Sequence, residues 1–180
     1  MDKVRGTIIT ILGLVNRALY RTEIVKFVYM IDEMYYKHFG TTITGLSYEW
    51  DHFGPNSVDD AIVKEAEELV NLGILHMSSE PNQYGGTSYL YKLEKSDGKF
   101  LGSLSDGEKY VARDVTCHYR NISLPKLIET SKQTESFQGV KQYDRIILKQ
   151  SKKYQELVES LKADKEFVGC IEAVGKEMAR

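Results

Sequence analysis

The chain has 180 residues, of which 42% are hydrophobic and 28% charged, and its formal net charge is -2. The length predicts one domain of moderate size, and the composition excludes a disordered chain. The nearly balanced charge excludes a strong overall attraction to nucleic acid or to anionic membranes, so such binding would need a local patch. Cys117 and Cys170 lack the spacing of a zinc site or a redox pair, so we expect reduced thiols and a cytoplasmic protein.

The first two predicted helices carry apolar residues at three- and four-residue steps, the pattern of one buried helical face. The first covers residues 2–15, and the second follows an N-cap at Thr22 and ends at Phe39, with Gly40 as its stop. The apolar run 7–15 lacks the small-residue cleavage site of a signal peptide, so we expect a core helix there. No later stretch reaches the roughly 20 apolar residues that span a bilayer.

Residues 47–53 alternate in character and predict a short strand after an extended turn. In such a strand, Tyr48, Trp50 and His52 would share one side, and Phe53 would lie on the other. The strand therefore offers a compact set of aromatic side chains.

A third helix is predicted over residues 57–72, after a chain break at Gly54 and Pro55. Residues 74–77 and 87–93 then predict a hairpin, since the loop between them is rich in turn residues. This order of helices and hairpin is that of a winged-helix domain. We therefore predict a mainly α fold with a small β hairpin (α+β), built as a winged-helix-like core with C-terminal helices.

The second half of the chain is predicted to be helical. Its first helix begins with a capping box at Ser105 and Glu108, and its second begins at Ser123 and Pro125. We expect residues 1–97 to form the core and residues 98–180 a helical extension that packs on it as a single domain. The helices of this half are expected at residues 105–118, 123–132, 143–161 and 164–178, with a polar loop over 131–140.

No group of residues points to catalysis, a metal or a cofactor. Asp51 and His52 could serve as acid and base or as metal ligands, but neighbours on a strand point to opposite faces. Gly85 and Gly86 lack the lysine and the following helix of a phosphate loop. We therefore expect no enzyme activity, no catalytic residues, no metal site and no cofactor.

The third predicted helix argues against binding in a DNA groove. Lys64 is its single basic residue, and affinity for DNA comes largely from Lys and Arg that neutralise phosphates. The acidic residues of this helix are Asp59, Asp60, Glu65, Glu67 and Glu68. Basic residues gather instead near the C-terminal end, at Lys141, Arg145, Lys149, Lys152 and Lys153. They are expected to form the solvated face of a terminal helix.

Aromatic side chains are concentrated in the first third of the chain. Such residues are favoured at protein interfaces because they bury much area with little loss of side-chain entropy. They also fill cores, so two interpretations stay open: some form a partner surface, or all pack inward. The residues concerned are Tyr29, Tyr35, Tyr36, Tyr48, Trp50 and Phe53.

Three motifs in this region resemble a known family. They are KFVYMID at residues 26–32, ITG at residues 43–45 after Gly40, and Gly54-Pro55 after Tyr48. In this order they resemble the Panacea domain of SocA-like antitoxins, which has a K-L-L-Y-L-A-D-like helix, then G-x-P-I-T-G and then G-P. The resemblance covers about residues 22–75. Thr42 stands where the family often has proline, and this difference concerns packing.

The resemblance implies a non-enzymatic domain that neutralises a toxin by direct binding or presents it to a protease, commonly in phage-associated loci. It agrees with the missing catalytic set and the acidic third helix. Our leading hypothesis is an antitoxin-like, protein-binding module whose partner contacts include Tyr48, Trp50, His52 and Phe53. The alternative is a winged-helix DNA-binding transcriptional regulator.

Overall fold

The computed structural model of the protein describes residues 1–82, 85–95, 98–151, 156 and 160. Met1–Lys149 form one compact unit and Gln150–Arg180 a second. The helices and strands from α1 to β6 belong to the first unit. They are mainly helical with two small antiparallel sheets, which confirms the predicted fold class.

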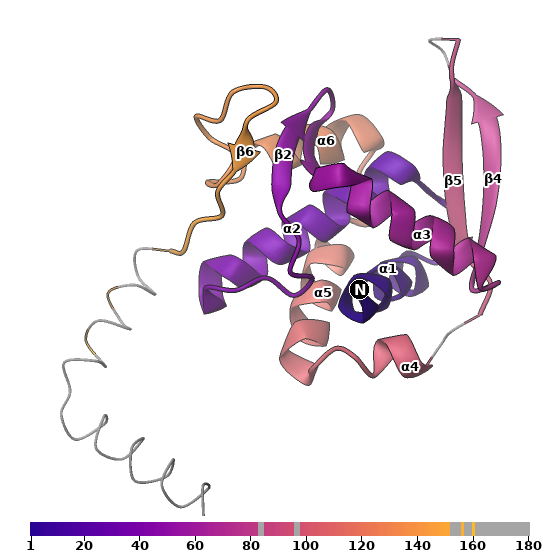
Figure 1. Cartoon of the computed structure of the whole chain (residues 1–180), viewed down its shortest axis with the longest axis horizontal. Coiled ribbons are helices and arrows are strands. Elements are labelled where there is room, and N and C mark those ends of the chain that lie inside the picture. Colours follow the sequence, from indigo (N-terminus) through magenta and orange to yellow (C-terminus); the bar gives the residue numbers. More distant parts are fainter. Residues whose placement is uncertain (83–84, 96–97, 152–155, 157–159, 161–180) are drawn as a thin grey trace, which may run out of the picture. The chain divides into compact units, whose positions relative to one another are not determined.

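Helix α2 (Arg21–Phe39) lies at the centre of the first unit (Figure 1). All residues from 23 to 33 are buried, so the helix is enclosed on every side along this part. The sequence pattern had predicted a single buried face. Helices that pack against α2 include α1 (Asp2–Val15), α3 (Ala61–Asn71), α5 (Asp106–Tyr119) and α6 (Leu124–Lys132).

The first sheet has the order β1-β5-β4 and contains the predicted hairpin. Strands β4 (Leu75–Pro81) and β5 (Thr87–Leu93) pair from Leu75 opposite Leu93 to Pro81 opposite Thr87. The short strand β1 (Leu19–Tyr20) pairs with the other side of β5. The hairpin follows directly from the C-terminal end of helix α3, and α3 also contacts β4 (Figure 1).

The second sheet has the order β3-β2-β6. Strands β2 (Tyr48–Asp51) and β3 (Gly54–Ser57) form a tight hairpin around a turn at His52 and Phe53. Gly54 has φ +94°, and a Cβ there would lie 2.9 Å from Cε of Lys132. The positive φ favours glycine at this position, and the flexible side chain of Lys132 in α6 lies against it.

The predicted third helix was too long at its N-terminal end. Residues 54–57 form β3, a short 3₁₀ turn follows at Val58–Asp60, and α3 begins only at Ala61. Asp59 and Asp60 adopt left-handed backbone conformations, which interrupt the helix. Ser57 still caps α3, since its Oγ accepts a hydrogen bond from the Ile62 N–H at 3.0 Å.

The predicted helix over residues 143–161 was wrong for its first part. Tyr143 has a left-handed conformation, and Arg145–Ile146 form β6, which pairs with β2. Ile146 is buried opposite Tyr48, so residues in this stretch alternate between core and solvent, as a strand requires. Most of the rest of this helix and all of the helix predicted at 164–178 lie outside the described residues.

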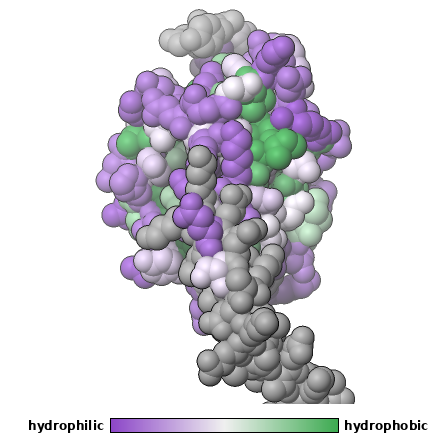
Figure 2. All heavy atoms as spheres, turned by 90° about the vertical axis from the view of Figure 1, so that its left-hand side faces the viewer, coloured by the Kyte–Doolittle hydropathy of each residue, from purple (hydrophilic) through white to green (hydrophobic). Residues whose placement is uncertain are grey.

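The side of the molecule that carries β6 has apolar groups at its surface. Figure 2 faces this side and shows hydrophobic residues among hydrophilic ones. Ile147, directly after β6, is 72% exposed. A shallow hollow of about 570 Å³ lies beside it, between β6 and the loop that follows α2.

Helix α1 crosses the short helix α4 (Gly98–Leu101) at Gly6, where the backbones come into close contact. A Cβ on Gly6 would lie 2.5 Å from the Phe100 carbonyl oxygen. We therefore expect Gly6→Ala to lower the free energy of unfolding by about 1–3 kcal/mol, because α4 must move away. Gly13→Ala is the matched control, since its Cβ would meet only a side-chain atom at 3.6 Å. In urea titrations the control should leave stability unchanged or raise it slightly. Equal midpoints for the two variants would contradict this packing.

Candidate partner-binding site

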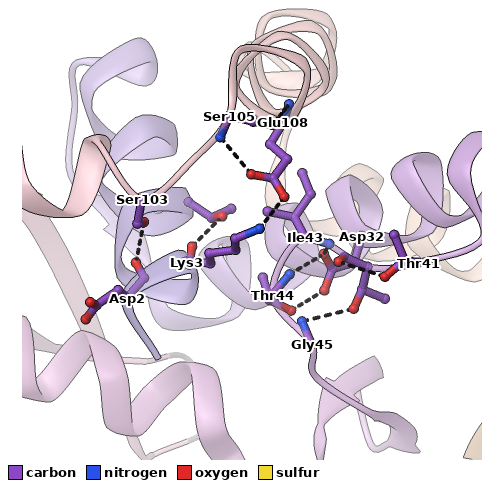
Figure 3. A network of polar contacts seen from close by, with 12 residues as sticks. Asp2, Lys3, Asp32, Thr41, Ile43, Thr44, Gly45, Ser103, Ser105 and Glu108 are labelled. Atoms are coloured by element: carbon purple, nitrogen blue, oxygen red, sulfur yellow. Dashed lines mark hydrogen bonds and ion pairs between the residues drawn. The ribbon is translucent and has the colours of Figure 1, made fainter. Parts of the chain in front are cut away.

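A buried carboxylate joins α2 to the loop that follows it. Asp32 is fully buried, and its Oδ1 accepts hydrogen bonds from the backbone N–H groups of Ile43 and Thr44 at 2.9 and 3.1 Å (Figure 3). Its Oδ2 accepts hydrogen bonds from the hydroxyl of Thr44 and, at 2.6 Å, from that of Tyr48. The aspartate of the KFVYMID motif thus holds the ITG motif and the first residue of β2 in place.

Burial raises the pKa of the Asp32 carboxyl to about 6, although the hydrogen bonds from Thr44, Tyr48 and Ile43 oppose the rise. Desolvation disfavours the charged form, and donors aimed at both oxygens favour it. At neutral pH the carboxylate is therefore ionised and can accept all its hydrogen bonds.

The lysine of the same motif supports the next loop. Lys26 is only 2% exposed, and its Nζ donates a hydrogen bond to the Pro55 carbonyl at 2.6 Å. This carbonyl belongs to β3, in the Gly54-Pro55 motif. All three family motifs therefore meet in one arrangement: two polar side chains of α2 hold the segment from the end of α2 to β3.

Burial lowers the pKa of Lys26 to about 7, with Asp51 opposing the shift and Lys132 adding to it. In the unfolded chain the same amine releases its proton near 10.5. Between these values the unfolded state binds more protons than the folded state, so stability rises with pH. We expect the free energy of unfolding of wild type, minus that of Lys26→Met, to increase by about 1 kcal/mol per pH unit from neutral pH upward.

Urea titrations at several values between neutral pH and pH 9 would measure that difference. The control is Lys64→Met on the exposed face of α3, which should follow the wild-type profile at every pH. Parallel curves for wild type and Lys26→Met would show that Lys26 does not titrate in this window.

Three surface hollows share Arg21 in their lining, and we call them together the Arg21 groove. Arg21 lines all three, Phe53 lines two, and Tyr89 lines two. The groove runs between the β2–β3 turn, α3, the β4–β5 hairpin and the start of α6. The Arg21 guanidinium carbon lies 5.5 Å from the centre of the Tyr89 ring, so the arginine is stacked on the hairpin.

The four residues predicted to contact a partner do not share one surface. Tyr48 is 1% exposed, and its hydroxyl is engaged by Asp32, so it belongs to the core and is not available to a partner. Trp50 is half-buried, with its ring 4.7 Å from that of Phe137. Strand alternation placed these two on one side of β2, but this side packs inward, with Tyr48 against Tyr29 of α2 and Trp50 against Phe137.

His52 and Phe53 form the turn between β2 and β3 and diverge from it. His52 is exposed, and its ring lies 5.6 Å from that of Tyr143. Phe53 is 58% exposed and lines two hollows of the Arg21 groove. Of the four residues predicted to contact a partner, Phe53 is thus the one that lines the Arg21 groove. His52 lies on the other side of the β2–β3 turn.

No role was assigned from the sequence to Arg21, Tyr89, Lys26 or Asp32, although the last two begin and end the KFVYMID motif. A signal for the last two was present, since residues 24–32 are apolar all round the helix except at these positions. A charged residue inside an enclosed helix needs a buried partner. Arg21 and Tyr89 lie far apart in sequence, and nothing local marks them as neighbours.

Among the described residues, no cluster of three or more His, Cys, Asp or Glu side chains is placed to hold a metal ion. Within the same part of the chain, no helix has the length and apolar character to cross a membrane. Asp51 and His52 lie on the two sides of the hairpin end and have no hydrogen bond to each other.

The protein is thus a mainly helical domain in which residues of the three motifs hold the segment from the end of α2 to β3, beside the Arg21 groove. The family model described as "Antitoxin SocA-like, Panacea domain" matches residues 24–138. Because this is more than half of the chain, the protein belongs to that family, as the motifs predicted. No curated protein and no solved structure gave a significant match.

Proposed function

We propose that this protein is an antitoxin that neutralises a toxin by direct, non-catalytic binding in the cytoplasm, with Phe53 and the Arg21 groove as its contact surface. Membership of the SocA-like antitoxin family is the observation that carries the proposal. The match begins at the α2 motif and ends after α6, so it includes most of the groove.

The chemistry of the groove supports a protein as its ligand. Phe53 is a large, half-exposed aromatic residue between two hollows, and Arg21 and Tyr89 stand beside it. Aromatic residues and arginine dominate the binding energy of interfaces when they enter a pocket of the partner. Trp50 and His52 lie outside the Arg21 groove, and we propose them as secondary contacts on the other flank of the β2–β3 turn.

The buried supports suit the same role. Asp32 and Lys26 fix the backbone on both sides of the β2–β3 hairpin, so Phe53 is presented from a rigid turn. A contact that is already ordered before binding loses less entropy on association. The family motifs thus serve the surface indirectly, through the loop that carries Phe53.

Coexpression with the product of the adjacent gene tests the proposal. We expect that product alone to stop growth, and coexpression of this protein to restore it. Copurification of the two proteins would show binding, and the toxin level in the rescued cells would distinguish neutralisation by binding from presentation to a protease, since presentation requires the protease and lowers that level. A neighbour that never inhibits growth would contradict the antitoxin role.

DNA binding by a winged-helix domain is the competing outcome. In that case helix α3 would enter the major groove of the DNA, but the exposed positions of α3 include Glu67 and Glu68 beside Lys64. A mobility shift with the operator-containing upstream DNA at low salt measures this directly. A shift that weakens steeply with salt would favour the regulator and count against the antitoxin proposal.

A further inference from the structure

The hollow of the Arg21 groove nearest to α2 has a buried lysine, Lys26, in its lining. It has a volume of about 220 Å³ and is lined by residues of α2, the β2–β3 hairpin, the 3₁₀ turn and α3. Lys26 lines it with a side chain that is 2% exposed. The apolar part of the lining is Val25, Phe53 and Val63.

The Lys26 amine has fewer partners than it has protons. An ammonium carries three N–H donors, and among the described residues Nζ donates only to the Pro55 carbonyl. No carboxylate of the described residues lies within ion-pair distance of it. A buried ammonium without an anion loses hydration that a single carbonyl replaces only in part.

The other charges around the hollow are arranged by depth. Asp60 is exposed and accepts a hydrogen bond from Asn56 at 2.9 Å, and Asp51 is half-buried, so water screens both carboxylates. Arg21 at the rim has no carboxylate of the described residues within ion-pair distance, and Lys132 lies near enough to act on Lys26. The deepest charge is therefore positive, with Arg21 and the carboxylates of Asp51 and Asp60 also in the lining, and Asp51 acts on Lys26 more strongly than Lys132 does.

We propose that this hollow receives the carboxylate of a glutamate side chain of the toxin, with Lys26 as its buried partner, Arg21 at the rim and Phe53 against its aliphatic part. A carboxylate would accept the unused N–H groups of Lys26 and supply the missing anion. A lysine or arginine would instead meet the buried Lys26 and Arg21, with only the water-screened carboxylates of Asp51 and Asp60 to offset them. This assignment rests on the proposed function, because it takes the toxin as the source of the glutamate.

The test uses the full chain with blocked glutamate (acetyl-Glu-N-methylamide) as the probe, followed through the ¹³Cε resonance of Lys26 in NMR. We expect saturable shifts with blocked glutamate and none with blocked glutamine or blocked lysine. Because the bound carboxylate requires the ammonium form, and the pKa of Lys26 is about 7, binding should be about tenfold weaker at pH 8 than at pH 6. Equal shifts with blocked glutamine would overturn the proposal.

Two variants locate the site. Val63→Phe fills the hollow beside Lys26 and should abolish the shifts, whereas Val70→Phe in the adjoining hollow should leave them unchanged. Tighter binding of acetyl-leucine, which offers a chain-terminal carboxylate, would overturn the assignment to a glutamate side chain. The wild-type titrations decide the proposal even where a variant fails to fold. They involve no toxin, so their failure leaves the antitoxin proposal intact, and a failed growth rescue leaves the carboxylate site intact.

Discussion

Asp32→Ala is expected to lower the free energy of unfolding by about 4 kcal/mol. The carboxylate accepts hydrogen bonds from two backbone N–H groups and two hydroxyls, all in the loop after α2 or at the start of β2. Alanine leaves these donors buried without an acceptor, and each such donor costs about 1–3 kcal/mol before the loop relaxes. Urea denaturation followed by far-UV circular dichroism would measure the change.

Two further variants make this result specific. Asp32→Asn keeps the shape but turns an NH₂ group toward donors, so it should remain at least about 2 kcal/mol less stable than wild type. Asp114→Ala removes an exposed carboxylate of α5 and should change stability by less than about 0.5 kcal/mol. Similar midpoints for Asp32→Ala and Asp114→Ala would show that the buried network does not hold the loop.

Phe53→Ala is expected to weaken binding of the toxin about thirtyfold while leaving the stability of the free protein nearly unchanged. Phe53 is 58% exposed, so its ring contributes little to the core, and a central aromatic contact in an interface is worth about 2 kcal/mol. Isothermal titration calorimetry of the purified pair would give the affinities, and the coexpression assay should show a matching loss of growth rescue.

Tyr110→Ala is the matched control for this loss. Tyr110 is an aromatic residue of α5 that is 71% exposed and lines none of the three hollows of the Arg21 groove. Its removal should leave affinity and rescue at the wild-type level. Equal losses for the two variants would mean that the groove is not the contact surface.

Helices α1, α2, α5 and α6 followed from local patterns because their signals lie within single stretches of sequence. The capping box at Ser105 and Glu108 is formed, and Pro125 lies in the first turn of α6. The strands β3 and β6 did not follow, since each exists only by pairing with β2. Gly54 and Pro55 looked like a chain break, although they form part of β3. Before β6 the backbone turns at Tyr143 in a left-handed conformation, and no glycine stands at that position to indicate the turn.

The candidate site was predictable only as a region. The stretch from Tyr48 to Phe53 contains two groove residues, Asp51 and Phe53, but alternation along a strand could not show that Phe137 would pack on Trp50 or that Tyr48 would bond to Asp32. Tyr89 reaches the groove from a hairpin far along the chain. Such contacts depend on tertiary packing, so a single sequence does not specify them.

The family motifs could be recognised from the sequence before their physical role was known. Residues 26–32, 43–45 and 54–55 looked like separate signatures, and the structure joins them through Asp32 and Lys26. Their shared task is to fix the loop that presents Phe53. The proposed toxin contact therefore depends on residues that the toxin does not touch as well as on those it does.

Hydrogen–deuterium exchange of the protein with and without the adjacent gene product tests the central claim most directly. Toxin binding at the Arg21 groove predicts slower amide exchange in the complex at residues 20–26, 51–60 and 87–90, with the exposed end of α5 near Tyr110 unchanged. Failure to form a complex, or protection confined to surfaces outside these segments, would contradict neutralisation through the groove.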